Sequence, residues 1–306
     1  MDIFHHIRYV PRKEIDVARW DACIANAANT ILYGFHFYLD HMAAGQWDAL
    51  VLGDYEAVMP LTWRRKYGIR YLYQPPFTQQ TGIFAANPLP QNIIEAFLQT
   101  ARRHFRFAEI CLNYGNALPT LLPRTNYILS LAAPYEEIAK KYKKILTHKL
   151  KLANRAALRY TSEVDLDTAL ETNRREYGAR MPHVSRLDHD HFRDVCGYLQ
   201  RQGQLVLRAA VDAAGQPLST VLLFRDQRAL YLIQPTTPKA GRKVEANRFL
   251  LDGLIREWAG RPLLLDFEGS DIPGIASFYA NFGGESQPYY FYRYNELPWP
   301  VNLIKR

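Results

Sequence analysis

The sequence of 306 residues contains only three cysteines, at Cys23, Cys111 and Cys196. They are widely spaced and none belongs to a CxxC pair, so the patterns of a zinc ribbon and of a disulfide framework are both missing. We therefore expect reduced, buried thiols, as is typical of a cytoplasmic protein. Residues 1–6 contain no basic segment followed by an apolar one, so we expect no signal peptide.

Long apolar runs are also missing. No stretch approaches the roughly 20 apolar residues that a membrane-spanning helix needs, so we expect no membrane span. Neither a GxSxG elbow nor a GxxxxGK[ST] loop occurs, which argues against α/β-hydrolases and P-loop NTPases. With 48% apolar and 22% charged residues the composition is typical of a globular protein, and the formal charge of +8 modestly favours an anionic partner.

One supersecondary pattern occurs twice. Residues 71–75 (YLYQP) are followed by Gly82, and residues 231–235 (YLIQP) are followed by Gly241. An internal repeat indicates the architecture before any side-chain chemistry is considered, and the length suffices for two cores. We expect two lobes, residues 1–133 and 134–306, because Pro134 ends a strand and begins a helix.

Each lobe is expected to run strand, two helices, three antiparallel strands, helix, strand, helix, strand. The last strand of the first lobe is expected near residues 127–131, and that of the second near residues 288–294. In the second lobe a helix at residues 244–258 joins strands 229–234 and 263–267, which should therefore be parallel neighbours. The point where such strands separate is a natural crevice for a ligand.

The segment FYANFGG (residues 278–284), preceded by Ala276, resembles the A-x-x-Φ-Y-x-x-Φ-G-F helix that ends many GNAT-type N-acyltransferase domains. It has one residue fewer between Ala276 and Tyr279, and Gly284 replaces the last Phe. Two such lobes, with a basic helix opening the second, are similar to Fem-type aminoacyltransferases and to acetyltransferase-like two-lobe proteins. The resemblance implies an α/β fold of two tandem GNAT-like lobes, each a mixed sheet flanked by helices, with a degenerate first lobe.

In the family, a Q/R-x-x-G-x-G/A loop holds the pyrophosphate of acyl-CoA at a helix N-terminus. Here it corresponds to residues 235–245, after Gln234. Gly241 stands where a tight phosphate turn would need it, but the second glycine is absent. Positive charge comes from Lys239, Arg242 and Lys243. The missing second glycine fits Fem-type enzymes, whose acyl donor is carried by tRNA. We therefore expect acyl-CoA or aminoacyl-tRNA as co-substrate and no permanently bound cofactor. Alternatively the loop is a basic surface segment that caps a helix.

The resemblance assigns to Tyr279 the protonation of the leaving group, which a phenol with a pKa near 10 can perform. Fem-type enzymes often have lysine at this place. The alternative is that Phe278, Tyr279 and Phe282 are simply core aromatics. Asp266 and Glu268 end a buried strand and should point to one side of it. We prefer Glu268 as the base that deprotonates an incoming ammonium, whereas Asp266 could instead accept bonds from nearby backbone N–H groups.

A basic run from residue 140 to 151 contains no acidic residue. It should form an amphipathic helix with a cationic flank, which is either a solvated face or a site for the phosphates of tRNA. The lysines concerned are Lys140, Lys141, Lys143, Lys144, Lys149 and Lys151.

The residues Asp188, His189, Asp190 and His191, with His183 nearby, could suggest a metal ion. We predict no metal site, because no well-spaced third ligand accompanies them and Asp188 suits the N-cap of the following helix. The resulting hypothesis is an N-acyltransferase acting on a small-molecule or peptide amine. The alternative is a non-catalytic nucleotide- or RNA-binding protein that retains the tandem fold.

Overall fold

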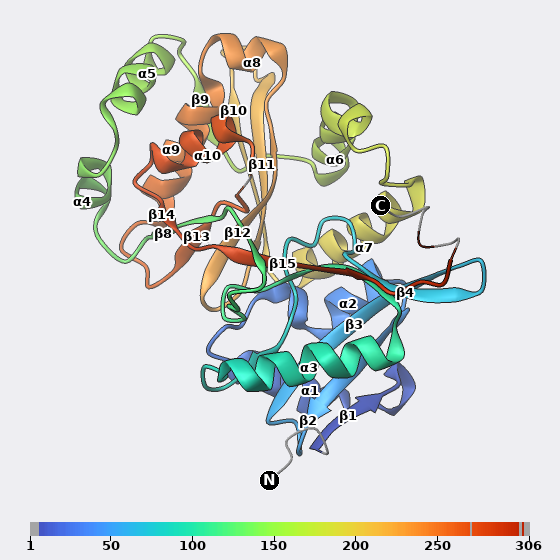
Figure 1. Ribbon diagram of the computed structural model, residues 1–306. Coiled ribbons are helices and arrows are strands. Elements are labelled where there is room, and N and C mark those ends of the chain that lie inside the picture. Colours follow the sequence, from blue (N-terminus) through green and yellow to red (C-terminus); the bar gives the residue numbers. More distant parts are fainter. Residues whose placement is uncertain (1–5, 270, 300–301, 303–306) are drawn as a thin grey trace. The chain divides into compact units, whose positions relative to one another are not determined.

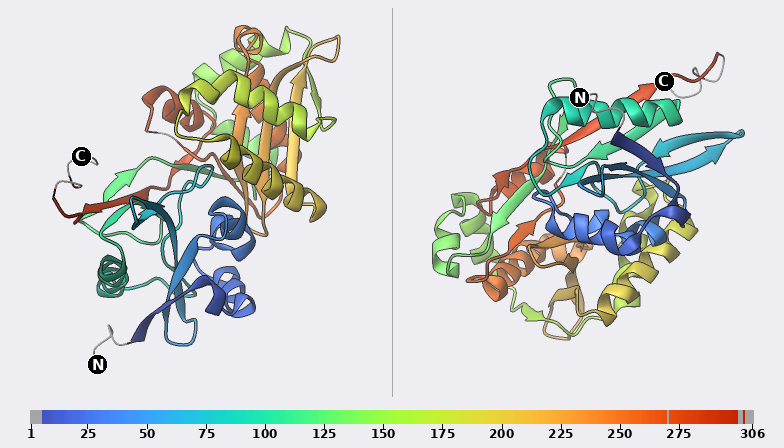
Figure 2. Two further views of the ribbon diagram at one scale, coloured as in Figure 1. Left: turned by 90° about the vertical axis from the view of Figure 1, so that its right-hand side faces the viewer. Right: turned by 90° about the horizontal axis from the view of Figure 1, so that it is seen from below.

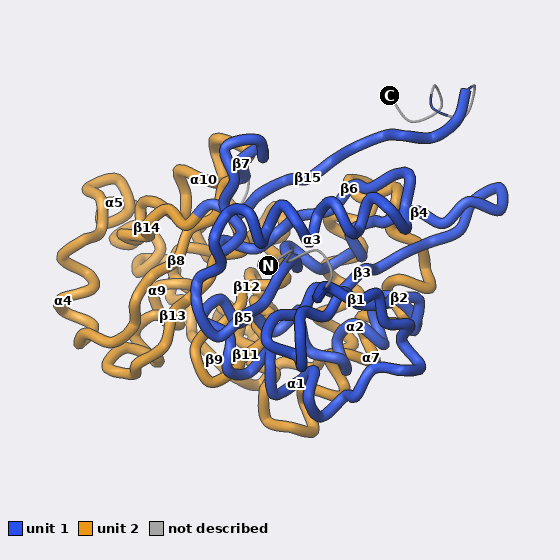
Figure 3. Tube along the Cα trace, turned by 60° about the horizontal axis from the view of Figure 1, so that its bottom comes forward, with its two compact units in different colours: residues 1–124, 288–306 blue, residues 125–287 orange. Residues whose placement is uncertain are grey.

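The chain divides into two units, each built on one mixed β-sheet (Figure 1). The computed structural model describes residues 6–269, 271–299 and 302. Unit 1 comprises Met1–Arg124 and Pro288–Arg306, and unit 2 comprises Thr125–Gln287 (Figure 3). Within the described residues, no helix combines the length and apolar character needed to cross a membrane.

The sheet of unit 1 has the strand order β1-β2-β3-β4-β6-β15-β7, with β5 paired to β3. The pair β4 and β6 is parallel, and the other pairs are antiparallel. Its strands are β1 (Ile7–Val10), β2 (Trp47–Leu52), β3 (Ala57–Lys66), β4 (Ile69–Tyr73), β5 (Phe84–Ala85), β6 (Phe107–Leu112), β7 (Leu122–Arg124) and β15 (Tyr289–Asn295). Its helices are η2 (Arg12–Glu14), α1 (Val17–Asn26), η3 (Leu32–Gly34), α2 (His36–Met42) and α3 (Gln91–His104).

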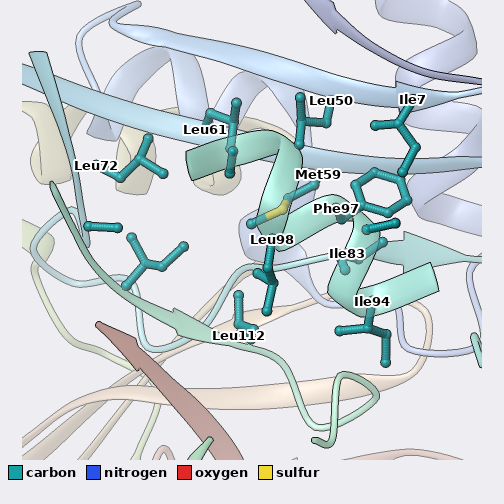
Figure 4. Close-up of a cluster of buried hydrophobic side chains, with 14 of the residues drawn as sticks. Ile7, Leu50, Met59, Leu61, Leu72, Ile83, Ile94, Phe97, Leu98 and Leu112 are labelled. Atoms are coloured by element: carbon teal, nitrogen blue, oxygen red, sulfur yellow. The ribbon is translucent and has the colours of Figure 1, made fainter. Parts of the chain in front are cut away.

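Helix α3 covers one face of this sheet. Ile94, Phe97 and Ala101 recur at helical spacing and are buried against strand residues such as Met59 and Leu61 (Figure 4). Burying a large apolar side chain of this kind contributes about 1.5–3 kcal/mol.

The sheet of unit 2 has the order β14-β8-β13-β12-β11-β10-β9, in which only β12 and β13 are parallel among the pairs described. Its strands are β8 (Tyr127–Ser130), β9 (Arg159–Thr161), β10 (Leu205–Val211), β11 (Pro217–Arg225), β12 (Ala229–Thr236), β13 (Leu264–Asp266) and β14 (Glu285–Ser286). Its helices are α4 (Tyr135–Lys140), α5 (Lys144–Asn154), α6 (Leu166–Tyr177), η4 (Gly178–Arg180), α7 (Arg186–Arg201), α8 (Lys239–Lys243), α9 (Ala246–Trp258) and α10 (Pro273–Ala280).

Helices cover both faces of the unit 2 sheet (Figure 2). On one face Leu254 of α9 is buried with Leu230 and Leu232 of β12. On the other face Phe192 of α7 contacts Phe224 of β11, with ring centroids 5.7 Å apart. A sheet buried on both faces explains why its strands read as nearly continuous apolar runs.

Apart from β5, the two sheets match strand for strand, and each receives one strand from the other half of the chain. Strand β15 takes in unit 1 the place that β8 takes in unit 2. The chain therefore crosses between the units twice, after Arg124 and after Gln287. The boundary predicted after residue 133 differs from this division, and the final strand expected in each lobe belongs to the other sheet. Alternation of apolar residues identifies a strand but not the strand with which it pairs.

Candidate functional site

Strands β12 and β13 separate near the middle of the unit 2 sheet. They pair in parallel for three residue pairs, the last being Tyr231 with Asp266. Strand β12 then continues along β11, with a bulge at Ile233, while β13 ends. The predicted parallel pairing is confirmed. Ligands of open α/β sheets bind at the carboxyl ends of strands where neighbours diverge, so we build the candidate site from this point.

Two side chains of α6 bind the segment that follows the bulge. Asn173 Nδ2 donates to Thr236 Oγ1 at 2.8 Å. The backbone N–H of Thr237 donates to Tyr177 Oη at 3.2 Å, and Tyr177 Oη lies 3.4 Å from the carbonyl oxygen of Thr237. Neither residue was predicted from the sequence. Their i,i+4 spacing places them on one helix face, but nothing in the spacing points to polar partners some 60 residues later.

Tyr279 of α10 lies beside the same point. Its ring stacks on Phe267, with centroids 4.8 Å apart and an interplanar angle of 22°. Burial raises the pKa of Tyr279, and the nearby Glu268 and Tyr177 raise it further. Its hydroxyl makes no hydrogen bond to the described residues, and it is not among the fully buried side-chain atoms that lack a partner. The ring of Tyr279 is therefore part of the hydrophobic core, as expected if residues 278, 279 and 282 were core aromatics. Its hydroxyl is nevertheless free to bond a substrate.

Asp266 and Glu268 have different environments. Asp266 is buried, and its Oδ1 accepts bonds from Asn126 Nδ2 at 3.0 Å and from the N–H of Glu268 at 2.9 Å. Burial raises the pKa of Asp266 to about 6, although these two bonds oppose the shift. Because β13 ends at Asp266, Glu268 follows the strand with a left-handed φ of 51°, so it does not continue the strand alternation expected from the sequence. Its side chain is half-buried next to Tyr279.

Gly241 does not form the tight phosphate turn that the sequence suggested. It lies inside the short helix α8, where a Cβ atom would come within 1.8 Å of the carbonyl oxygen of Leu218 in β11. The glycine is thus required by the close approach of helix and strand. Arg242 Nη1 donates to the carbonyl oxygen of Thr237 at 2.5 Å, which directs this guanidinium back to the end of β12.

The other predicted donor-site residues surround this helix. Lys239 and Lys243 are exposed at the two ends of α8. Gln234 is buried in β12, opposite Leu222. All of the predicted donor-site residues therefore lie at the end of β12 or in α8. That they contact a donor stays a prediction.

An ion-pair cluster joins α5 to the start of α9, and its acidic member was not predicted from the sequence. Glu245 precedes α9 with a φ of 58°, and its carboxylate pairs with Arg248 and, at 2.7 Å, with Lys149 Nζ. The i,i+3 spacing of Glu245 and Arg248 could have signalled the local pair, but not the contact with α5. A carboxylate therefore stands where the family resemblance placed a bound pyrophosphate.

The basic segment forms two helices, α4 and α5, instead of one. The N–H of Lys143 between them donates to the carbonyl oxygen of Asn281, and Lys141 lies 4.0 Å from Glu285. Of the predicted tRNA contacts, Lys149 is the one paired with Glu245. The remaining lysines are exposed: Lys140, Lys141, Lys143, Lys144 and Lys151.

The acidic and histidine-rich segment begins helix α7. Ser185 is the N-cap of this helix, and Asp188 completes a capping box at the third helical position, rather than serving as the N-cap itself. Across residues 6–269, 271–299 and 302, no group of three or more His, Cys, Asp or Glu side chains is placed to hold a metal ion.

Comparisons with known proteins agree with this architecture. Residues 139–272 match the model of the Acetyltransferase (GNAT) domain. The chain has the tandem GNAT fold. The matched segment contains most of unit 2, including the separation of β12 and β13, so a GNAT unit provides the candidate site. The description of the matched domain supports acyl transfer in general.

Solved structures with this tandem GNAT fold extend over nearly the whole chain. A crystal structure of FemX is similar with a TM-score of 0.65 and 13% identity, covering 97% of this chain and 99% of that one. A tandem GNAT protein from the clavulanic acid biosynthesis pathway has a TM-score of 0.53 and 13% identity, covering 95% and 99%. L-PGS from Bacillus licheniformis has a TM-score of 0.50 and 10% identity, covering 94% of both chains. No curated protein sequence matches.

Proposed function

We propose that this protein is an N-acyltransferase that transfers an acyl or aminoacyl group to an amine, with its reactive site in unit 2. The observation that carries the proposal is the position of the Tyr279 hydroxyl. It lacks a partner among the described residues, and it lies near Glu268 and Tyr177 where β12 and β13 separate. An unpaired hydroxyl beside a carboxylate is suited to proton transfer.

The proposed reaction needs one base and one acid. Glu268 takes a proton from the ammonium of the acceptor, and the free amine attacks the donor carbonyl. Backbone N–H groups near the bulge at Ile233 stabilise the negative oxygen of the intermediate. The new C–N bond forms, and the nitrogen of the intermediate loses its second proton to solvent. The C–S or C–O bond to the donor then breaks, and Tyr279, which solvent later reprotonates, protonates the departing thiolate or alkoxide. The raised pKa of Tyr279 keeps the phenol protonated at neutral pH.

Two features of unit 2 favour an aminoacyl ester on tRNA over acyl-CoA as donor. Gly241 is helical and tightly packed, so it does not present a phosphate-binding turn. The carboxylate of Glu245 at the start of α9 is paired with Lys149 and Arg248, so these two cations are already occupied and are not free to bind a pyrophosphate. The exposed lysines of α4 and α5, in contrast, can contact a phosphodiester backbone.

The donor is tested by incubating purified protein with labelled acetyl-CoA or with a mixture of aminoacyl-tRNAs, each with a panel of small and peptide amines. Mass spectrometry then identifies the acylated products. We expect an aminoacylated amine from the tRNA mixture. Transfer from acetyl-CoA alone would identify CoA as the donor and contradict the argument from Glu245.

A second experiment separates catalysis from binding alone. Titration with uncharged tRNA at two salt concentrations measures the electrostatic contribution to RNA binding. Tight, salt-dependent RNA binding without acyl transfer from either donor would favour the alternative, a non-catalytic RNA-binding protein with the tandem fold.

A further inference from the structure

We propose that unit 1 contains a second anion-binding site, a pocket that binds a phosphate group and is separate from the reactive site of unit 2. The pocket has a volume of about 360 Å³ and lies at the end of the β3–β4 hairpin. Its charged lining consists of Arg65, Arg70, His104 and Arg106. Three guanidinium groups around one cavity are an unusual concentration of positive charge within a unit.

The hairpin holds two of these arginines in fixed positions. Tyr67 and Gly68 form its two-residue turn, with φ values of 51° and 78°. A two-residue turn with both φ values positive is the type that matches the twist of antiparallel strands and fixes their register. Arg65 and Arg70 are therefore paired directly across the two strands. Like charges directly opposite each other destabilise a sheet, and a bound anion would remove that cost.

The surrounding carboxylates neutralise only part of this charge. Arg70 Nη1 lies 3.4 Å from Asp48 Oδ2, and the same carboxyl group also accepts bonds from the Tyr9 hydroxyl and from the N–H of Arg12. The side chains of Arg65 and Arg106 have no acidic partner in the part of the chain that the structure describes. Of the three guanidinium groups, only that of Arg70 is paired with a carboxylate among the described residues.

The imidazole of His104 provides a flat wall for the pocket. It stacks on Tyr9, with ring centroids 4.2 Å apart and an interplanar angle of 19°. Burial and the charge of Arg70 lower the pKa of His104. The excess positive charge at neutral pH therefore comes from the arginines, which stay charged at all relevant pH values.

This combination is suited to phosphate. Guanidinium groups bind phosphate oxygens in a bidentate manner, and two unneutralised arginines match the charge of a diphosphate or of two successive phosphodiesters. The cavity is larger than a single phosphate ion, so the ligand carries its phosphate on a larger group. Either a phosphorylated small molecule or an RNA backbone supplies this chemistry.

The test uses the full-length protein with inorganic pyrophosphate and with a short single-stranded RNA, each titrated by isothermal calorimetry. We compare the wild type with Arg65→Gln, Arg106→Gln and the control Arg201→Gln. Arg201 is an exposed arginine at the end of α7 in unit 2, so the control removes the same charge elsewhere. Melting temperatures verify that each variant is folded.

We expect saturable binding that weakens roughly tenfold for each pocket arginine removed and stays unchanged in Arg201→Gln. A response to pyrophosphate would identify a phosphorylated small molecule as the ligand source, and a response to RNA alone would identify the nucleic acid backbone. The proposal is overturned if neither probe binds below millimolar concentration, or if the control variant loses as much affinity as the pocket variants.

Discussion

Asn126 Nδ2 donates a hydrogen bond to Asp266 Oδ1 over 3.0 Å. Asn126 lies at the first crossing of the chain between the units, and its backbone carbonyl accepts a bond from Gln287 at the second crossing. Its Oδ1 also accepts the N–H of Gly269 at 2.7 Å. One buried asparagine therefore connects both crossings to the turn that carries Glu268.

The buried carboxyl group of Asp266 predicts an unusual pH dependence of stability. Its pKa is about 6 in the folded protein and near 3.9 in an unfolded chain, so the folded state binds the proton more tightly. The free energy of unfolding should therefore fall as the pH rises from about 4 to 6, by up to about 3 kcal/mol. Asp266→Asn keeps an oxygen that accepts the backbone N–H of Glu268 and removes the titrating carboxyl group. The pH-dependent loss of stability should therefore disappear, and the variant should be more stable than the wild type at pH 7.

Urea unfolding between pH 4 and 8 measures the difference between wild type and Asp266→Asn. The control is Asp194→Asn on the exposed side of α7, for which we expect a constant difference. Parallel curves for wild type and Asp266→Asn would show that Asp266 does not titrate in this range.

Removal of the Tyr279 hydroxyl tests the proposed acid. Tyr279→Phe keeps the ring on Phe267, so the fold should be retained. We expect kcat to fall by about 10²–10⁴ with little change in the KM for the donor, because a general acid acts on the leaving group and not on ground-state binding. Steady-state kinetics with the donor identified above provide the measurement.

The matched control for this variant is Tyr135→Phe, which removes a hydroxyl that bonds Asp252 at 2.8 Å on the α4 side of the unit. Its kcat should stay close to that of the wild type. An unchanged kcat in Tyr279→Phe would eliminate the phenol from the mechanism.

Substitution of Gly241 tests the reason for the glycine in α8. Gly241→Ala places a Cβ atom 1.8 Å from the backbone of Leu218, so helix or strand must shift, and we expect a loss of about 1–3 kcal/mol in unfolding free energy. Gly274→Ala is the control, since no atom lies within 4 Å of its Cβ position and α10 should be unaffected or slightly stabilised. Equal stability of the two variants would contradict the packing argument.

The strand exchange predicts that residues 1–133 do not fold by themselves. This fragment lacks β15, whose Tyr294 is buried in the core of unit 1 and donates to the carbonyl oxygen of Phe105 at 2.8 Å. Arg124 and Tyr289 are paired residues of β7 and β15. A chain of residues 1–124 joined through Asn-Gly to residues 289–306 should therefore close a hairpin and fold.

Circular dichroism and the cooperativity of thermal unfolding distinguish the two chains. We expect a cooperative transition only in the rejoined chain. Cooperative unfolding of residues 1–133 alone would mean that unit 1 does not depend on its last strand.

The repeat and the helical spacing of apolar residues were sufficient to predict two lobes of mixed sheet, because these signals are local in the sequence. The exchange of β8 and β15 was not predicted, since pairing depends on partners that no periodicity identifies. In the candidate site, Tyr279 was predicted from the family resemblance, and Glu268 from its place at the end of a buried strand. Tyr177, Asn126 and Glu245 were missed because their roles arise from contacts with distant segments.

The order of the strands also determines the order in which the protein can be completed during synthesis. Residues 125–287 contain every strand of their own sheet, so this half can close as soon as it has left the ribosome. Unit 1 begins at the N-terminus, but one edge of its strand β6 stays unpaired until β15, which ends at Asn295, has been translated. A nascent chain of this protein thus exposes an open strand for most of its translation, which is the period when it is most in need of a chaperone.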